Sequence, residues 1–478
     1  MPALTDEEIA AIGIVTRGRA DSLAACIDSY LENCRRHERS PAFVVTDDSP
    51  DEDSRSHTTA ALHALRERGA RISYGGRAER LRFAETLARE SGVPIDVIRF
   101  ALLGDDRCPL TTGANRNSLL LDTVDTLILS VDDDTRCRIG SVSDGDAQLV
   151  PFTGYDPTEF WFHPDRRSAL ETVAFIDADV LGCHEAMLGR RADDSGASVA
   201  VTLQGIAGDS GMGSSRYYLG LEGASRARLV ASPESYASAF RSREVVRAAR
   251  RPTLADSPFC MTTCIGFDNR ALLPPFFPVQ RNSDGIFGLM LHRYGAKYRT
   301  GFLPSVVVHD PDPPRLFVPD ELWTTAIRMA DVVMACLFAH DPANATGTAA
   351  TALAGLGRFF QELGALPLAD FEARIRSVQQ FRTMAFITHL ETQLRTHDST
   401  PAFWAEDVRR LVALLWATTG AEDAVVPGDL RDEGGAGAAC RLSQELVGRF
   451  GQVLESWPAI VEAARRLRAQ GRRLTTPL

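Results

Sequence analysis

The chain of 478 residues has no run of about 18 apolar residues, the length that a membrane-spanning helix needs. It also lacks the basic and then apolar start of a secretory leader, because its first eight residues include Asp6, Glu7 and Glu8. We therefore expect a cytoplasmic protein without a transmembrane segment.

The cysteines lack the regular spacing of a disulfide framework. There are nine, an odd number, scattered from Cys26 to Cys440, which favours a reducing compartment. The one close pair, Cys260 and Cys264, has no second pair or nearby histidines in zinc-finger arrangement, so we do not expect a zinc site there.

Basic residues are not in excess. The chain has 52 Lys and Arg against 63 Asp and Glu, a net charge of −11, which argues against a general nucleic-acid-binding protein. Its composition, 44% hydrophobic and 24% charged, is that of a globular protein long enough for two or three domains.

The first third of the chain alternates short β-rich runs with helical patterns, which is typical of an α/β fold with parallel strands and crossover helices. We expect strands at residues 12–16, 42–46, 96–100 and 126–131. Asp21 is expected to cap a helix after the first strand, because apolar residues recur there at helical spacing: Leu23, Cys26, Ile27, Tyr30 and Leu31.

The remaining pattern divides the chain into two predicted domains, residues 1–316 and 317–478. Within the first, residues 136–258 are rich in Gly, Ser and Asp and predict an irregular insertion that binds an acceptor. Regular structure returns with strands at 264–267 and 305–308 and a helix at 286–294.

Beyond Pro319 the long amphipathic patterns predict an all-helical C-terminal domain, with Asp320 as a cap and residues 428–439 as a loop. Its apolar stripes are more numerous than one buried face requires, which predicts a homodimer. The last helix is rich in arginine and is expected to present either a solvated basic face or a surface for an anionic membrane or polymer, through Arg465, Arg466, Arg468, Arg472 and Arg473.

Three aspartates, Asp132, Asp133 and Asp134, directly follow the apolar run 126–131. Ligands of open α/β sheets bind at the carboxyl ends of the strands, so the triplet is expected to meet Thr16-Arg17 and Asp47-Asp48 in one crevice. Buried carboxylates need a cation or hydrogen-bond donors, and Mg²⁺ or Mn²⁺ prefers oxygen ligands. A solvated acidic loop is the alternative.

These motifs, in their order along the chain, resemble glycosyltransferase family 2. The resemblance covers about two thirds of the chain, from Ile12 to His309, and implies a GT-A fold: a mixed sheet flanked by helices. It rests on Thr16-Arg17-Gly18-Arg19 after the first strand, Asp47-Asp48 after the second, Gly113-Ala114-Asn115-Arg116-Asn117, and the aspartate triplet.

The resemblance implies an inverting, metal-dependent transfer of a sugar from a nucleotide-sugar, with a UDP-sugar favoured. Its implied donor-binding residues are Thr16, Arg19, Asp47, Asp48, Arg116, Asp132 and Asp133. The implied ligands of Mn²⁺ or Mg²⁺ are Asp134 first, then Asp132 and His309, which ends the strand 305–308.

Asp284 is the implied general base, which takes a proton from the acceptor. The family often has Glu-Asp at this position, whereas this chain has Ser283-Asp284. A helix N-cap is the structural alternative for Asp284.

Two further motifs and two further functions are alternatives to this interpretation. Asp177 and Asp179 form a second Asp-x-Asp, near His184-Glu185, as a fallback metal site or part of an ordinary helix. Gly208-Asp209-Ser210-Gly211 imitates a serine-protease turn without the required context. The alternative functions are a nucleotide-sugar sensor or scaffold and a sugar nucleotidyltransferase. The sequence does not identify the acceptor among a saccharide, a peptide and a natural product.

Overall fold

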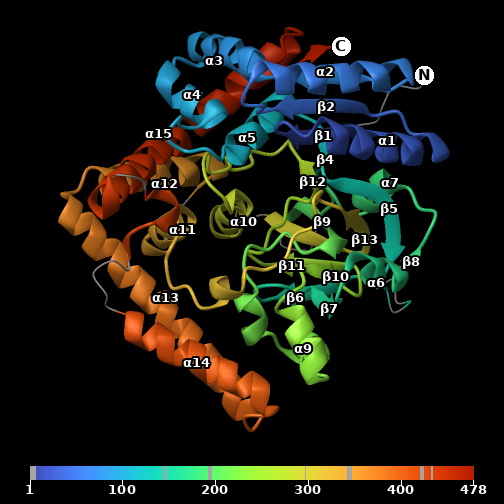
Figure 1. Cartoon of the computed structure of the whole chain (residues 1–478). Coiled ribbons are helices and arrows are strands. Elements are labelled where there is room, and N and C mark those ends of the chain that lie inside the picture. Colours follow the sequence, from blue (N-terminus) through green and yellow to red (C-terminus); the bar gives the residue numbers. More distant parts are fainter. Residues whose placement is uncertain are drawn as a thin grey trace.

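The computed structural model describes residues 7–143, 145, 148–191, 196–295, 298–341, 347–419, 425–431 and 434–478 (Figure 1). Its strands are β1 (Ile9–Thr16), β2 (Ala42–Asp47), β3 (Ile72–Gly75), β4 (Leu127–Asp132), β5 (Thr135–Ser141), β6 (Val150–Thr153), β7 (Glu159–Phe162), β8 (Ala174–Phe175), β9 (Ser198–Asp209), β10 (Glu244–Ala248), β11 (Thr253–Asp256), β12 (Cys264–Asp268), β13 (Tyr298–His309) and β14 (Thr476–Pro477).

The α-helices are α1 (Ala20–Arg36), α2 (Glu52–Glu67), α3 (Arg77–Ser91), α4 (Ile95–Leu103), α5 (Thr112–Asp122), α6 (Arg166–Glu171), α7 (Val180–Glu185), α8 (Gly223–Leu229), α9 (Pro233–Ala239), α10 (Ser283–Tyr294), α11 (Met329–Ala339), α12 (Ala349–Gly364), α13 (Leu368–Thr396), α14 (Ala402–Thr418) and α15 (Gly435–Ala469). Short 3₁₀ helices are η1 (Arg216–Gly220), η2 (Pro319–Leu322) and η5 (Gly428–Leu430).

One large mixed sheet organises the protein, in the order β14-β3-β2-β1-β4-β12-β9-β13-β11-β6. Strands β3, β2, β1 and β4 run parallel, and β12 is antiparallel to both of its neighbours. The chain winds outward from β1 to β2 and β3 and then returns to place β4 on the other side of β1. The carboxyl ends of β1 and β4 therefore flank a topological switch point, where α/β sheets bind ligands.

Alternate residues of the strands face two different helical layers. Phe43 and Val45 of β2 join the core beneath α1 and α2, whereas Val44 joins the core beneath α5 and α10. The protein is thus α/β, with a mixed sheet flanked by helices and followed by a helical C-terminal region.

The predicted strand at residues 96–100 is wrong, because this segment forms α4. Its apolar run is buried on nearly every side, with Ile98, Phe100, Ala101 and Leu102 fully enclosed against α3, α5 and α15. A short run that is buried all round has no period that separates a strand from a helix. The first helix was predicted correctly, but its N-cap is Arg19, and Asp21 lies in its first turn.

Residues 136–258 are more regular than predicted. The segment supplies most of β5 and all of β6 to β11, including β9, which lies in the middle of the sheet between β12 and β13. Eleven of the twelve residues of β9, from Val199 onward, are buried, and glycines and polar residues interrupt its apolar run. Because of this composition, the hydrophobic pattern of the segment does not predict a central strand.

The C-terminal helices share a core with the first half of the chain. Helix α15 packs on α12 and also on α3, α4 and α5, and Trp457 donates a hydrogen bond of 2.9 Å to the carbonyl of Leu273. In Figure 1, α15 (red) runs beside α3 and α4 (blue). The final strand, β14, then pairs with the sheet edge at β3.

Most of the arginines predicted to form a basic surface bind the first half of the chain, although Arg466, Arg472 and Arg473 are also exposed, the last two just after the end of α15. Arg465 pairs with Asp125 at 2.8 Å, Arg466 with Glu90 at 2.8 Å, and Arg473 with the buried Asp122. Arg468 donates to the carbonyl of Asp122. Their role is to fasten α15 to the sheet domain.

Two further predictions concern the helical region. The helix expected from Asp320 is divided into η2 and α11, which begins after Arg328. The loop expected at 428–439 is shorter, since α15 begins at Gly435, and residues 432–433 lie outside the described part. The homodimer stays a prediction. Two large hydrophobic side chains of the helical region are exposed to solvent, Phe381 at 75% and Trp416 at 53%.

No helix within the described ranges is long and apolar enough to cross a membrane. All nine cysteines are free thiols.

Candidate functional site

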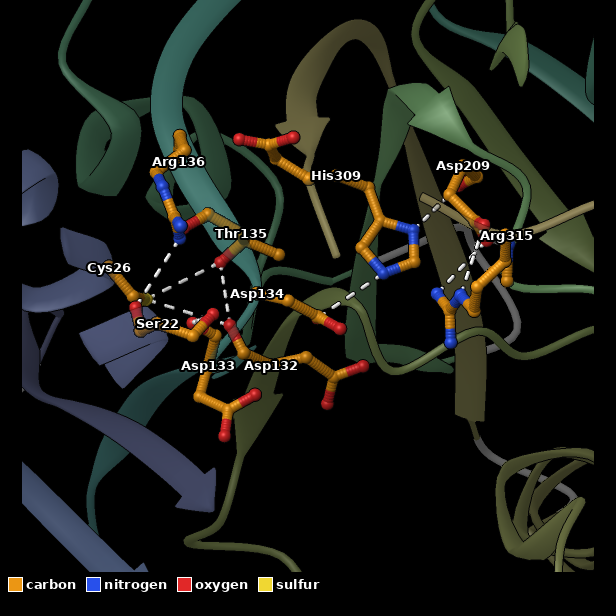
Figure 2. Close-up of polar contacts among 12 residues, drawn as sticks. Ser22, Cys26, Asp132, Asp133, Asp134, Thr135, Arg136, Asp209, His309 and Arg315 are labelled. Atoms are coloured by element: carbon orange, nitrogen blue, oxygen red, sulfur yellow. Dashed lines mark hydrogen bonds and ion pairs between the residues drawn. The ribbon is translucent and has the colours of Figure 1, made fainter. Parts of the chain in front are cut away.

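The aspartate triplet lies in the tight turn between β4 and β5. Asp132 is the last residue of β4, Thr135 is the first of β5, and the Thr135 hydroxyl closes the turn by donating to the Asp132 carbonyl at 2.8 Å (Figure 2). Thr16 ends the neighbouring β1, and its hydroxyl donates to Oδ2 of Asp133 at 2.6 Å. The triplet therefore meets Thr16 at the switch point of the sheet, as predicted, whereas no hydrogen bond or ion pair of the described residues joins it to Arg17, Asp47 or Asp48.

His309 meets the triplet from the far half of the sheet. It ends β13, which pairs with β5 so that His309 lies opposite Thr135. Its Nε2 is 3.2 Å from Oδ1 of Asp134, and both side chains are about 95% buried. The backbone N–H of Asp310 donates to the Asp134 carbonyl at 2.7 Å, which fixes the two segments together.

Two arginines balance the carboxylates. The half-exposed Arg19 bridges Asp133 and Asp134, donating to Asp134 at 2.9 Å, and Arg116 pairs with Asp132 at 2.7 Å. The structure thus brings together both arginines that were predicted to bind the donor. It also shows that hydrogen-bond donors already offset much of the buried negative charge.

The pKa shifts of the three carboxyl groups differ in direction. It raises the pKa of Asp132 despite Arg116, and it raises the pKa of Asp133 to about 7 despite Arg19. Burial also acts on Asp134, but the contact with His309 outweighs it and holds the Asp134 pKa below its usual range. For His309 burial opposes the charge, yet Asp134 raises its pKa. Both shifts favour the charged forms of His309 and Asp134, which lie 3.2 Å apart.

Asp209 is a site residue that the sequence analysis missed. Its backbone carbonyl accepts a 2.6 Å hydrogen bond from Nδ1 of His309, and its fully buried carboxylate accepts from Arg243 and Arg315 (Figure 2). Asp209 ends β9, so the same argument that singled out the triplet applies to it.

Gly208 is required for this arrangement. Its φ is +122°, and a Cβ atom there would lie 2.3 Å from the carbonyl oxygen of His309. The close approach of β9 and β13 at this pair excludes a side chain.

Asn115, in the segment before Arg116, ties the strand ends together. Its amide donates to the carbonyls of Thr16 and Thr46 at 3.2 and 2.9 Å. The preceding Gly113 lies against the backbone before α10, where an added Cβ would be 1.8 Å from the carbonyl oxygen of Phe277. The motif that carries Arg116 is therefore built for close packing.

Asp47 is the last residue of β2, Asp48 follows it, and both carboxylates accept hydrogen bonds from other residues of the chain. The carboxylate of Asp47 accepts from the Tyr74 hydroxyl at 2.9 Å and from Ser49. Asp48 accepts from the fully buried Arg80 and from Thr111. Nothing in the structure tests their predicted contact with a nucleotide, which stays a prediction.

Asp284 lies in the first turn of α10, half-buried, and the N-cap is Asn282 rather than Asp284. Among the described residues, no ion pair or hydrogen bond joins it to the triplet. The start of α10 does adjoin the start of α5, where Ala114 N–H donates to the Pro278 carbonyl. Burial raises the pKa of Cys260 between them, with Asp284 raising it further and Arg116 opposing. Asp284 therefore lies at the start of a helix that packs on α5, and no ion pair or hydrogen bond of the described residues joins it to the aspartates.

The second Asp-x-Asp has a structural role. Asp179 is the N-cap of α7 and pairs with Arg39 at 2.7 Å, while Asp177 is 3.3 Å from His37. His184 is fully buried between Thr202 and Gln204, and burial lowers its pKa to about 4. These contacts match the ordinary-helix alternative.

Asp134 and His309 have the geometry of a two-residue cation site. Oδ1 of Asp134 is buried, and the described residues direct no hydrogen bond of regular geometry at it. Nδ1 of His309 donates to a carbonyl, as the second ring nitrogen of a metal-binding histidine usually does. Nε2, which faces Asp134, is then the atom that could bind a cation. Within the described ranges no three or more His, Cys, Asp or Glu side chains form a metal cluster. The site fits an ion that takes its other ligands from phosphate and water.

No protein-family model matches the chain, and no curated protein matches it.

Proposed function

We propose that the protein is a metal-dependent glycosyltransferase with a GT-A fold, which transfers a sugar from a nucleotide-sugar to an acceptor. The meeting of Asp134 and His309 carries this proposal: they come from distant segments and lie 3.2 Å apart at the ends of neighbouring elements of the sheet. The position at a switch point supports a nucleotide ligand.

The donor diphosphate needs positive charge around it, and two arginines border the triplet. Arg19 is 44% exposed at its side chain, so it is free to exchange part of its contact with Asp133 and Asp134 for phosphate oxygens. Arg116 pairs with Asp132. We favour a UDP-sugar as the donor.

Asp134 and His309 would hold Mn²⁺ or Mg²⁺, with Asp132 as a further oxygen ligand or a contact to the donor ribose. The cation supplies Lewis-acid stabilisation of the leaving diphosphate. Asp209 would keep the imidazole ring in the orientation that points Nε2 toward the ion.

In the proposed transfer, an acceptor hydroxyl oxygen attacks the anomeric carbon from the side opposite the diphosphate. The new carbon–oxygen bond forms as the bond to the diphosphate oxygen breaks, and that oxygen keeps the electron pair. Asp284 accepts the hydroxyl proton. This course inverts the configuration at the anomeric carbon.

Binding of UDP to the full chain, measured by calorimetry with and without Mn²⁺, tests the proposal. We expect Mn²⁺-dependent binding that Asp134→Ala and His309→Ala abolish. Asp177→Asn is the matched control and is expected to bind normally, because Asp177 faces His37 and Arg36. Unchanged Mn²⁺-dependent binding in Asp134→Ala would overturn the proposal.

A sensor or scaffold is the second candidate, because Asp284 does not contact the triplet. Donor hydrolysis without acceptor separates the two functions: slow turnover that Asp284→Asn abolishes, with UDP binding retained, supports the enzyme. Tight donor binding without turnover for any acceptor favours the scaffold. A sugar nucleotidyltransferase would form the nucleotide-sugar from nucleoside triphosphate and sugar phosphate, and Arg17-Gly18-Arg19 is too short for its usual Gly-rich loop.

A further inference from the structure

Three aromatic rings meet at the surface, two of them in the segment 136–258 that was predicted to bind the acceptor. The ring of Tyr155 lies 6.4 Å from that of Tyr217 and 6.2 Å from that of Phe259, measured between ring centroids. Tyr155 is 59% exposed, and Tyr217 and Phe259 are partly exposed. These three residues are called the aromatic patch.

Buried polar residues hold the aromatic patch in place. The hydroxyl of the buried Ser257 donates to the carbonyl of Tyr155 and accepts from the N–H of Phe259 at 3.1 Å, which joins the two backbones. The guanidinium group of Arg247 lies 4.3 Å from the centroid of the Phe259 ring and donates to Asp156 at 2.6 Å. Because the rings are already ordered, a ligand that packs on them loses little affinity to the ordering of side chains.

The charged groups at the patch form one buried ion pair. Among the described residues, the charged side chains that form a hydrogen bond or a cation–π contact with the three rings are Asp156, which accepts from Tyr217 at 3.5 Å, and Arg247. The side chains of Asp156 and Arg247 are about 95% buried, and they pair with each other. This arrangement favours an uncharged ligand over a cation, the usual ligand of an aromatic cage.

The segment before β12 runs along α10, which lies beside β11 (Figure 1). Near the end of α10, Nδ1 of His292 lies 2.9 Å from the Asp256 carboxylate. One turn earlier in the helix, a Cβ atom added to Gly288 would lie 2.4 Å from the carbonyl oxygen of Pro258. The following residues of the segment therefore approach the start of the helix, where Asp284 lies.

Asp284 shares a helix face with these contacts. It precedes Gly288 by four residues, so the two lie on one face of α10, about 6 Å apart along the helix axis. The segment continues to Thr263, whose carbonyl accepts a 3.1 Å hydrogen bond from the N–H of Asp132. Phe259 thus belongs to a stretch of chain that passes the proposed base and reaches the aspartate triplet.

An exposed aromatic ring that carries a polar group suits a sugar. The C–H groups on one face of a sugar ring are apolar and can pack on an aromatic ring, whereas the sugar hydroxyls need hydrogen-bond partners. The Tyr155 hydroxyl forms no hydrogen bond with the described residues, so it can bond to a ligand. A sugar also supplies the hydroxyl nucleophile that the proposed transfer requires.

We propose that the aromatic patch binds the acceptor, and that the acceptor is a neutral saccharide whose ring packs on Tyr155. This inference rests on the proposed function and names the class of its acceptor. Binding at the patch holds the saccharide beside the proposed base, Asp284.

Binding of neutral saccharides to the full chain tests the inference. The protein, with UDP and Mn²⁺ present, is applied to an array of neutral oligosaccharides built from glucose, galactose, mannose and N-acetylglucosamine, which also carries peptides that contain serine and threonine. We expect binding to at least one saccharide, whose affinity is then measured by calorimetry. Tyr155→Ala should weaken this affinity by about fivefold or more, as for loss of one aromatic contact, and Tyr155→Phe, which keeps the ring, should weaken it less.

UDP affinity should be the same in the wild type and in both Tyr155 variants, which shows that the variants are folded. Trp416→Ala is the matched control and should bind the saccharide normally, because Trp416 is also an exposed aromatic residue, at 53%, but lies on α14.

Equal saccharide binding by the wild type and Tyr155→Ala, binding of the peptides alone, or binding of neither class would overturn the inference while leaving the proposed function standing. Absence of UDP binding in the wild type would refute the glycosyltransferase, and the acceptor role with it, even if a saccharide binds at Tyr155.

Discussion

The carbonyl oxygen of Asp209 accepts a 2.6 Å hydrogen bond from Nδ1 of His309. A carbonyl only accepts, so Nδ1 carries a proton in every protonation state of the ring, and Nε2 is the atom that gains or loses one. Nε2 faces Asp134. A proton and a cation therefore compete for the same nitrogen atom.

This competition predicts a pH dependence of Mn²⁺ affinity. Asp134 raises the pKa of His309, so the metal-free ring is protonated at pH values somewhat above the ordinary range. We expect Mn²⁺ affinity to rise by up to about tenfold per pH unit until His309 is neutral. Calorimetry between pH 6 and 8.5 checks this. Affinity that is independent of pH would show that Nε2 is not a ligand.

Asp133→Asn should change the pH dependence of stability. Burial raises the pKa of Asp133 to about 7 from an ordinary value of 3.8, so between these values the folded state binds more protons than the unfolded state. This contribution is fully present below about pH 4 and is lost as the pH rises through about 7. In metal-free protein, the melting temperature of Asp133→Asn relative to the wild type should rise from pH 5 to pH 8. A difference that does not vary with pH would contradict the raised pKa, and Asp177→Asn serves as the control.

Gly208→Ala should damage the site through the backbone of His309. Positive φ and the 2.3 Å approach to the His309 carbonyl both oppose a side chain, and we expect a loss of about 2 kcal/mol or more in unfolding free energy together with weaker Mn²⁺ binding. Gly471→Ala is the matched control, because Gly471 has φ +73° but no atom within 4 Å of its added Cβ. Denaturant melts of both variants, with Mn²⁺ titrations, check this. Equal costs for the two variants and unchanged Mn²⁺ binding would rule out the steric argument.

Asp122→Asn should loosen the end of the chain. The fully buried Asp122 carboxylate accepts from Arg473 and from the N–H and hydroxyl of Thr475, just before β14. Loss of its charge should cost about 1.5–3 kcal/mol, the range for hydrogen bonds to charged groups. Asp125→Asn removes a half-exposed partner of Arg465 and should cost less than about 1 kcal/mol. Urea melts give both values, and equal costs would contradict the role of burial.

The sequence was most informative where an apolar run ends in polar residues. Asp132 to Asp134 and His309 were singled out because each ends such a run, and strands of one sheet end near each other. That argument requires only the order of the strands. It does not predict which side chains from different segments pair with each other. The ion pairs of Arg19 with Asp133 and of Arg116 with Asp132 were therefore not predicted.

The errors have physical reasons too. Helix α4 is buried on almost every side, so its residues have no polar face to reveal a helical period. Strand β9 is central in the sheet, yet Gly205 and Gly208 and polar residues break its apolar run. Asp209 was missed for the same reason, because it is the last residue of a strand that the sequence pattern did not predict.

Helix α15 shares one hydrophobic core with α3, α4 and α5. This shared core determines how the protein unfolds. Helices α12 and α15 enclose Trp457, Phe450 and Phe360 together with Phe100 from the first half of the chain. Separating residues 317–478 from residues 1–316 would expose both sides of one apolar layer. Amide hydrogens in α4 and in α15 should therefore exchange with solvent at the same slow rate, through a single global opening rather than two independent ones.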